Sequence, residues 1–273
     1  MKTVLITGAS SGIGKSLAEE FASRGFNVIA ASRNIEKTKF INRDAITKKQ
    51  LDVSDYKAIE NFVENLKNEK IEIDILINNA GYGLTGALIE LPIEEIEKEF
   101  KVNVFGAIKL AQLISKQMVE KRNGIIVNIG SVSGILTTPF VSAYCASKAA
   151  INSFSDGMRM ELMPFDVKVI TVTPGAIESN FGENAASIAQ KLLKENSLYE
   201  KYKSKILERA KLSQQNATPV NEFSSKLVDK ILSPNPPAVF RYGKMSFLAW
   251  FLGRCVKSGL RHKLLMNKFG LSD

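Results

Sequence analysis

The chain has 273 residues, of which 45% are hydrophobic and 24% are charged, as expected for one globular domain with a sizeable core. Its only histidine, His262, lies near the C-terminus, which excludes Ser-His-Asp and Cys-His catalysis and argues against any metal site built from histidines. Cys145 and Cys255 form no disulfide framework, and Met1 leads almost directly into an apolar segment, so we expect no signal peptide and a reducing, cytoplasmic location.

The chain begins with the pattern of a phosphate-binding strand, turn and helix. Residues 3–7 are expected to form a buried strand, and a turn with three glycines, Gly8, Gly12 and Gly14, follows them. The next helix should begin near Gly12 and end by Gly25. Glycines let the backbone approach a pyrophosphate, and the helix N-terminus supplies N–H donors and partial positive charge.

The same turn nearly matches a P-loop, because it ends in Gly14-Lys15-Ser16. The P-loop spacing requires a glycine at position 9, where this chain has Ala9, and Gly8 stands one residue too early. The turn therefore favours a dinucleotide site, with a P-loop nucleotide hydrolase as the alternative.

The end of the second expected strand, residues 27–31, indicates which dinucleotide is bound. Folds of this kind that prefer NAD usually place an acid here, where it binds the ribose 2′-hydroxyl. This chain has Ser32 at that place and Arg33 next, and an arginine can pair with a 2′-phosphate. We therefore expect NADP(H), with NAD(H) less favoured. The alternative is a surface arginine that merely follows a strand.

The middle of the chain adds further polar residues at the ends of apolar segments. Residues 34–48 are basic and irregular, and Asp52 and Val53 follow the third strand. A helix over residues 56–66 and a strand over residues 73–77 lead to the motif 79–81, Asn-Ala-Gly. A later helix opens at Pro92 and contains Asn103, which needs partners if it is buried. A capping or packing role is the alternative for this asparagine.

The candidate catalytic residues follow the fifth expected strand, residues 125–129. Ser131 comes directly after it, and Tyr144 and Lys148 are spaced to share one face of a helix. A positive charge about 4 Å from the phenol, at an effective dielectric of about 20, is worth roughly 4 kcal/mol. It should lower the tyrosine pKa toward the range in which a phenol can give and take a proton. Taken alone, the pair is more often a surface contact.

These motifs, in this order from Thr3 to about Ser179, resemble those of the short-chain dehydrogenase/reductase family. The resemblance implies a doubly wound α/β fold with a parallel sheet of about seven strands, and hydride transfer between NADP(H) and a carbonyl/alcohol pair. It assigns the acid/base role to Tyr144 and a hydrogen bond to the substrate oxygen to Ser131. It also implies that Lys148 lowers the Tyr144 pKa and holds the nicotinamide ribose, and that Asn103 kinks its helix and holds a relay water. The residues expected at the cofactor are Gly8, Ser10, Ser11, Gly12, Ile13, Gly14, Arg33, Asp52, Val53, Asn79, Ala80, Gly81, Tyr144, Lys148, Pro174, Gly175, Ile177 and Ser179.

We expect residues 1–273 to form a single domain, with residues 1–179 as its cofactor-binding and catalytic core. Residues 180–273 should form a substrate lid, a helix over residues 220–232, a strand over residues 238–240 and a basic tail. The tail, residues 241–273, has seven lysines and arginines against one acid, and its apolar run 245–252 is too short to cross a bilayer. Such a tail suits an anionic membrane surface, or it packs over its own substrate pocket. No recognised nucleic-acid motif accompanies the charge, so nucleic acid is not expected.

The resemblance further indicates a hydrophobic substrate, a lipid-, retinoid- or steroid-like ketone or secondary alcohol, and a role in lipid metabolism. It also implies a homodimer or homotetramer that pairs through the helices of residues 103–119 and 144–163. The alternative from another functional class is a non-catalytic, NADP-sensing binding protein on the same fold.

Overall fold

One parallel sheet of seven strands organises the computed structural model, which describes residues 1–272 apart from the side chain of Arg43. The strands are β1 (Thr3–Thr7), β2 (Asn27–Ser32), β3 (Ile46–Gln50), β4 (Ile75–Asn78), β5 (Gly124–Ile129), β6 (Val167–Pro174) and β7 (Val239–Tyr242). Their order across the sheet is β3-β2-β1-β4-β5-β6-β7, and every neighbouring pair is parallel. The prediction of a doubly wound parallel sheet is therefore confirmed.

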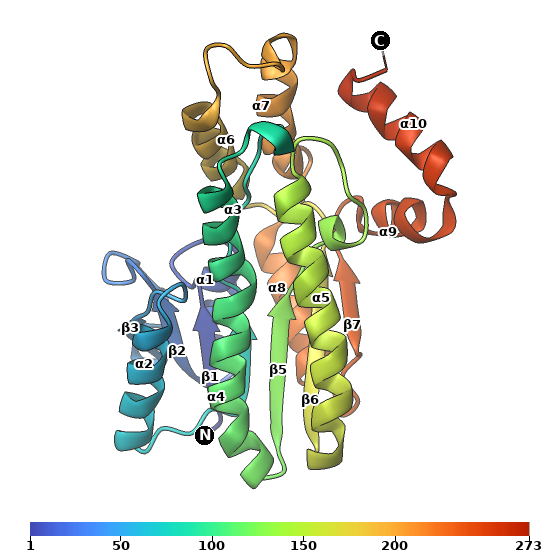
Figure 1. The fold of residues 1–273 in the computed structure, drawn as a ribbon. Coiled ribbons are helices and arrows are strands. Elements are labelled where there is room, and N and C mark those ends of the chain that lie inside the picture. The colour runs from blue at the N-terminus through green and yellow to red at the C-terminus, as the bar shows by residue number, and fades with distance from the viewer. Residues whose placement is uncertain (273) are drawn as a thin grey trace.

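Helices cover both faces of this sheet, and Figure 1 shows α4 and α5 in front of it and α8 behind it. The helices are α1 (Gly12–Ser23), α2 (Tyr56–Asn68), α3 (Ile93–Phe100), α4 (Ala107–Glu120), α5 (Ser142–Leu162), α6 (Phe181–Leu192), α7 (Lys203–Lys211), α8 (Val220–Ile231), α9 (Ser246–Cys255) and α10 (Ser258–Phe269).

The first strand shows how the sequence produces two cores. Successive side chains of a strand point to opposite faces of the sheet. Val4 and Ile6 pack with α1 and α8, whereas Leu5 packs with α2 and α4. Because both faces are covered, the three central residues of β1 are all apolar instead of alternating with polar residues.

The strand order reverses between β1 and β4, and this reversal positions the ligand site. β2 and β3 lie on one side of β1, while β4 to β7 extend on the other. In open α/β sheets, ligands bind outside the carboxyl ends of the strands at such a point. The Gly-rich turn, the segment 79–81 and Ser131 follow β1, β4 and β5, so the fold brings all three to this edge.

One segment differs from the sequence prediction, and the structure also places the basic tail. Residues 34–48 are not irregular throughout, because Ile46 begins β3 and pairs with Val28 of β2. The basic tail forms two helices, α9 and α10, which lie beside the upper end of the sheet in Figure 1. Buried Leu265 and Phe269 of α10 join a small core with Leu136 and Phe140, so the tail packs on the body of the protein. Within the described chain, no helix combines the length and apolarity needed to span a membrane.

Candidate active site

The Gly-rich turn between β1 and α1 has the geometry of a phosphate cradle. Gly8 and Gly12 have φ angles of 65° and 52°, which favour glycine over residues with a side chain. A Cβ on Gly8 would also lie only 2.8 Å from the Cα of Ala80. The side chain of Asn79 stabilises the turn, because its Nδ2 donates hydrogen bonds to the carbonyl oxygens of Thr7 (2.9 Å) and Gly8 (3.2 Å). The first turn of α1 carries no acid, so its N–H groups can receive an anion.

Gly14 does not line the cavity, unlike the other residues expected at the cofactor. A Cβ on Gly14 would lie 2.5 Å from the Gly8 carbonyl oxygen and 2.4 Å from the Asn79 Nδ2. Its place in the motif is explained by close packing of α1 against the turn. A direct contact between Gly14 and the cofactor stays a prediction.

The residues at the end of β2 fit a phosphorylated ribose. The hydroxyl of Ser32 is buried and lacks a hydrogen-bond partner, and this residue lines the cavity. Arg33 beside it is exposed and forms no ion pair with any described residue. Asp52, which lines the same end, has one carboxylate oxygen occupied by the N–H and hydroxyl of Ser54. An arginine and a hydroxyl without partners therefore face this end of the cavity, as a 2′-phosphate requires.

Ser131, Tyr144 and Lys148 converge where β5 ends and α5 begins. Ser131 follows β5, and its hydroxyl caps the next turn by accepting the N–H of Ser133 at 3.0 Å. The Lys148 ammonium is buried, lies 5.9 Å from the Tyr144 ring centroid and donates to the Ile129 carbonyl oxygen at 2.8 Å. Burial lowers the pKa of Lys148 to about 8.

The expectation that Lys148 lowers the Tyr144 pKa does not hold in this structure. Burial raises the pKa of the phenol well above its ordinary value. The hydrogen bond with Ser131 opposes this rise, and so does the positive charge of Arg209. Tyr144 is therefore a protonated phenol at neutral pH, which suits the donation of a proton.

Asn103 does not line the cavity. It lies in a π-helical stretch over residues Lys101–Gly106 that joins α3 to α4. Its Nδ2 donates to the Tyr82 carbonyl oxygen (2.9 Å) and the Ser147 hydroxyl (3.0 Å), and its Oδ1 accepts the Tyr82 N–H at 3.0 Å. The side chain thus joins the segment after β4 to α5, directly before Lys148. The irregular helix agrees with the expected kink, whereas the relay water stays a prediction.

One cavity of about 770 Å³ contains both the cofactor groove and a chamber beyond Tyr144. The predicted residues that line it include Ser131, Tyr144, Lys148 and Arg33. Beyond Tyr144 the wall combines many apolar residues with polar ones such as Thr138 and Arg209, and part of it comes from the C-terminal tail. The apolar residues of this chamber are Leu136, Val141, Phe181, Leu248, Ala249, Leu252, Leu264, Leu265 and Phe269.

Sequence reasoning missed three polar residues at this site. Glu99 is buried, accepts the Leu84 N–H at 2.8 Å, and has its pKa raised to about 8 by burial. Arg209 of α7 lines the chamber, and the Gln214 side chain accepts the Ser179 N–H at 2.9 Å. Only Glu99 had a local signal, because it precedes Asn103 by four residues and so faces the same side of the helix.

The family model for the short chain dehydrogenases matches residues 2–189. The chain is similar to the NADPH-dependent 1-acyldihydroxyacetone phosphate reductase of Saccharomyces cerevisiae, with 32% identity over 99% of this chain and 92% of the relative. It is also similar to the NADPH-dependent 3-dehydrocapnine reductase of Ornithobacterium rhinotracheale, with 32% identity over 68% and 69% of the two chains. A crystal structure of a short-chain dehydrogenase from Streptomyces avermitilis superposes with a TM-score of 0.79, at 27% identity over 99% and 97%.

The protein belongs to the short-chain dehydrogenase/reductase family, and it is an oxidoreductase acting on an alcohol/carbonyl pair. The family prediction made from the motifs is therefore confirmed. Two relatives named NADPH-dependent support the prediction of NADP(H) as the cofactor.

Proposed function

We propose that the protein is an NADPH-dependent reductase of a hydrophobic, lipid-like ketone. The observation that carries this proposal is the continuity of the cavity, in which Tyr144 stands between the groove marked by Arg33 and an apolar chamber. The acyl chain in the name of the yeast relative's substrate agrees with such a chamber. An apolar wall stabilises a bound alkyl chain by roughly 25 cal/mol for each Å² of its surface removed from water.

The arrangement supports the following division of roles. NADPH supplies the hydride that reduces the carbonyl carbon. Tyr144 donates its phenolic proton to the carbonyl oxygen, so that one hydride and one proton give the secondary alcohol. Ser131 donates a hydrogen bond to the same oxygen as negative charge develops on it. The raised pKa of Tyr144 keeps the phenol protonated at neutral pH, so that it can donate its proton to the carbonyl oxygen as negative charge develops there.

Lys148 and Asn103 are proposed to support this proton transfer. The ammonium of Lys148, held by the Ile129 carbonyl oxygen, faces the cavity beside Tyr144, where it can bind the nicotinamide ribose hydroxyls. Asn103 fixes Ser147 and thereby the turn of α5 that carries Tyr144 and Lys148.

The test is NADPH oxidation with long-chain ketones such as 1-acyl-dihydroxyacetone phosphate and 3-ketodihydrosphingosine. We expect turnover by the parent enzyme and a loss of about 100-fold or more in kcat for Tyr144→Phe, with NADPH binding retained. Binding without turnover of any carbonyl compound, in the parent and the variant alike, would support a non-catalytic NADP sensor.

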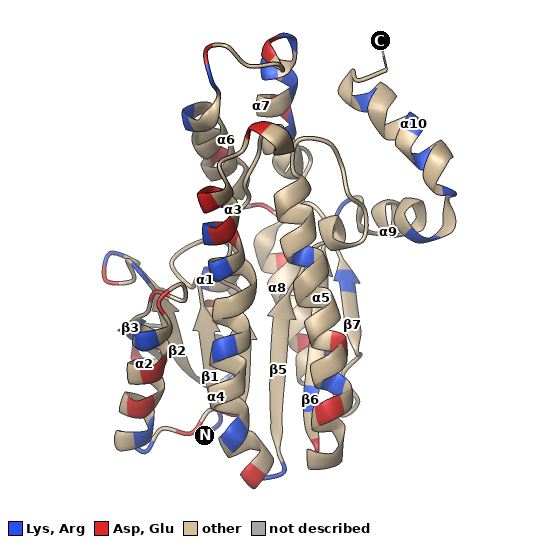
Figure 2. Ribbon diagram, viewed as in Figure 1, with Lys and Arg blue, Asp and Glu red and all other residues tan. Residues whose placement is uncertain are grey.

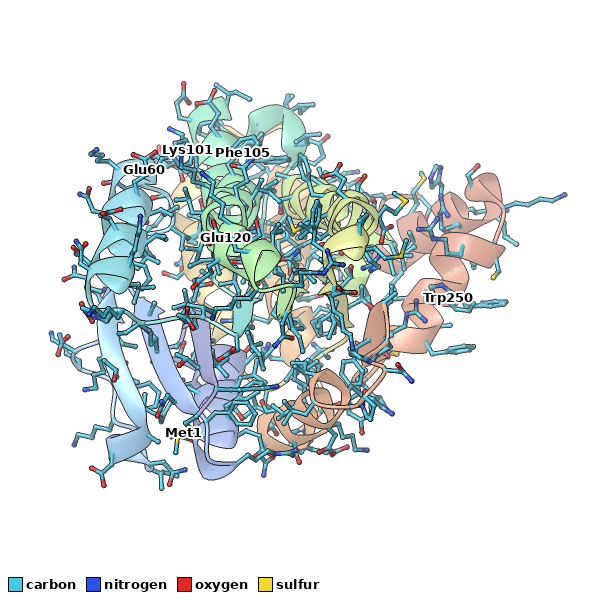
Figure 3. The ribbon with its side chains drawn as sticks, turned by 90° about the horizontal axis from the view of Figure 1, so that it is seen from below. Met1, Glu60, Lys101, Phe105, Glu120 and Trp250 are labelled. Carbon is cyan, nitrogen blue, oxygen red and sulfur yellow. The ribbon has the colours of Figure 1, made fainter. Side chains whose placement is uncertain are left out.

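We also propose that the tail touches a membrane surface. Phe247 and Phe251 of α9 have 68% and 44% of their surface exposed, and Trp250 lies at the outer edge of the molecule in Figure 3. Figure 2 shows α10 with basic residues and no acidic ones. Sedimentation with vesicles of anionic and of neutral lipid tests this proposal. Retention on anionic vesicles should be lost in a Phe247→Ser, Phe251→Ser variant, and equal retention by the variant would contradict it.

A second copy of this chain is proposed to cover the outer faces of α4 and α5. Phe105, Phe154, Met160 and Met163 are exposed on or next to these helices. Light scattering after gel filtration should give a dimer or tetramer, and Phe154→Glu should shift it to the monomer. A monomeric parent protein would contradict this assembly.

A further inference from the structure

Arg209 is a cation inside the substrate chamber that forms no ion pair with a carboxylate of residues 1–272. It lies on α7 and lines the same cavity as Tyr144. Its Nε and Nη2 both donate to the Thr138 hydroxyl oxygen, at 3.0 and 2.7 Å. Among the described residues, no acid lies within ion-pair distance of the guanidinium, and its Nη1 has no acceptor.

The unfavourable free energy of a charged Arg209 without an anionic partner indicates that this residue binds a ligand. Burial lowers the pKa of Arg209, which means that the surroundings disfavour its charge. The negative forms of Cys145 and Tyr144 are the groups that favour the charge, and both residues are protonated at neutral pH because burial raises their pKa values. A partly buried cation without an anionic partner is disfavoured, and a bound anion offsets this cost.

The other charged residues that line the chamber are also positive. Arg261 and Lys268 of α10 also line the cavity, and Phe269 places its ring centroid 5.9 Å from the Arg209 guanidinium carbon. The only acid among the lining residues is Asp52, at the end of the groove next to Arg33. An anionic group that enters the chamber therefore meets positive charge, apolar surface and neutral polar groups, and no carboxylate of the lining residues.

We propose that Arg209 binds the anionic group, a carboxylate or a phosphate monoester, of an amphiphilic substrate whose alkyl part lies against the apolar wall. The guanidinium offers paired N–H donors to two oxygens of such a group. Thr138 fixes the orientation of the guanidinium, because its hydroxyl oxygen accepts hydrogen bonds from Nε and Nη2 of Arg209. This inference rests on the proposed function, because it takes the chamber to be the substrate pocket.

The experiment is calorimetric titration of the enzyme saturated with NADP+, using decyl phosphate, decanoate and decanol as probes. The parent is expected to bind at least one of the two anions about tenfold or more tightly than decanol, because a charge-assisted hydrogen bond is worth about 1.5–3 kcal/mol. Arg209→Gln should erase this difference, whereas Arg209→Lys should keep part of it. Preference for decyl phosphate identifies a phosphate site, and preference for decanoate identifies a carboxylate site.

Arg254→Gln is the matched control, because it removes the same charge from an exposed position of α9 outside the cavity. It should leave the difference between anion and alcohol intact. Melting curves and NADPH titration show that each variant is folded. A parent that binds decanol as tightly as both anions, or an anion preference that survives in Arg209→Gln, would overturn the inference. Since binding is measured without turnover, a failure of the proposed reductase activity would be seen separately, in the ketone assay.

Discussion

Glu99 and Lys148 are two buried groups of opposite charge near Tyr144, and each stabilises the charged form of the other. Burial works against both charges, since it raises the pKa of Glu99 to about 8 and lowers the pKa of Lys148 to about 8. Two groups that interact and titrate in the same range share their protons as a pair. The number of protons bound by this pair is therefore expected to change between pH 7 and 9.

Replacing Glu99 by Gln should stabilise the protein increasingly as the pH rises. A carboxyl whose pKa is raised by folding favours the folded state below its unfolded value of 4.5, and this contribution is lost as the pH rises through about 8. Glutamine keeps an acceptor for the Leu84 N–H but has no charge to bury. Between pH 5 and pH 9, we expect the difference in unfolding free energy between variant and parent to grow by roughly 3 kcal/mol in favour of the variant.

Urea unfolding at the two pH values measures this difference. Glu94→Gln, on an exposed position of the same helix, is the control and should show no such growth. A constant difference for Glu99→Gln would mean that its carboxyl is not buried as the structure has it.

Replacing Lys148 by Met should separate activity from stability. Folding lowers this lysine's pKa, so its contribution to stability is present above the unfolded value of 10.5 and lost as the pH falls through about 8. Relative to the parent, the variant should be more stable at pH 6 than at pH 9.5, while kcat falls by about 100-fold or more. Thermal melting at both pH values and a steady-state assay test this. A variant that gains relative stability as the pH rises would contradict the assignment.

Removing the Gln214 side chain should strengthen cofactor binding. Its carboxamide contacts the Ser179 N–H at 2.9 Å and lies 3.4 Å from the Ile177 carbonyl oxygen. Ile177 and Ser179 are among the residues expected at the cofactor, so Gln214 occupies groups that the cofactor is expected to contact. We expect Gln214→Ala to lower the Kd for NADPH about fivefold, the worth of one hydrogen bond of about 1 kcal/mol. Fluorescence titration measures this, with Gln215→Ala as control, and weaker binding by Gln214→Ala would show that the glutamine assists the cofactor.

The π-helical stretch around Asn103 depends on a close approach at Gly106. A Cβ at this position would lie 2.0 Å from the carbonyl oxygen of Val53. Gly106→Ala should therefore lower the unfolding free energy by about 2 kcal/mol or more, and shift Asn103 with it. Gly259→Ala in α10 is the matched control, because a Cβ there meets no atom within 4 Å and alanine favours the helix. Equal stability of the two variants in urea unfolding would contradict the packing.

The sequence predicted the parts of the molecule that depend on local patterns. The Gly-rich turn, the apolar strands and the four-residue spacing of Tyr144 and Lys148 each determine structure over a short stretch, and residues 2–189 match the family. The sequence left open whether the tail packs over the pocket or faces a membrane, because Leu265 and Phe269 meet Leu136 only in the folded chain. Arg209 and Gln214 were missed for the same reason. The pKa of Tyr144 was predicted in the wrong direction because spacing gives the distance to Lys148 but not the burial of the phenol.

The most direct test of the central claim is titration of the protein with NADPH and with NADH, for the parent and for Arg33→Ala. An NADP(H)-dependent enzyme should bind NADPH about tenfold or more tightly than NADH, and loss of the Arg33 guanidinium should remove most of this difference by weakening NADPH alone. Lys37 is an exposed lysine of the same segment, and Lys37→Ala should leave the difference between NADPH and NADH affinity unchanged. Equal affinity of the parent for both dinucleotides would contradict the assignment of the 2′-phosphate to Arg33, and failure to bind either would contradict the proposed reductase itself.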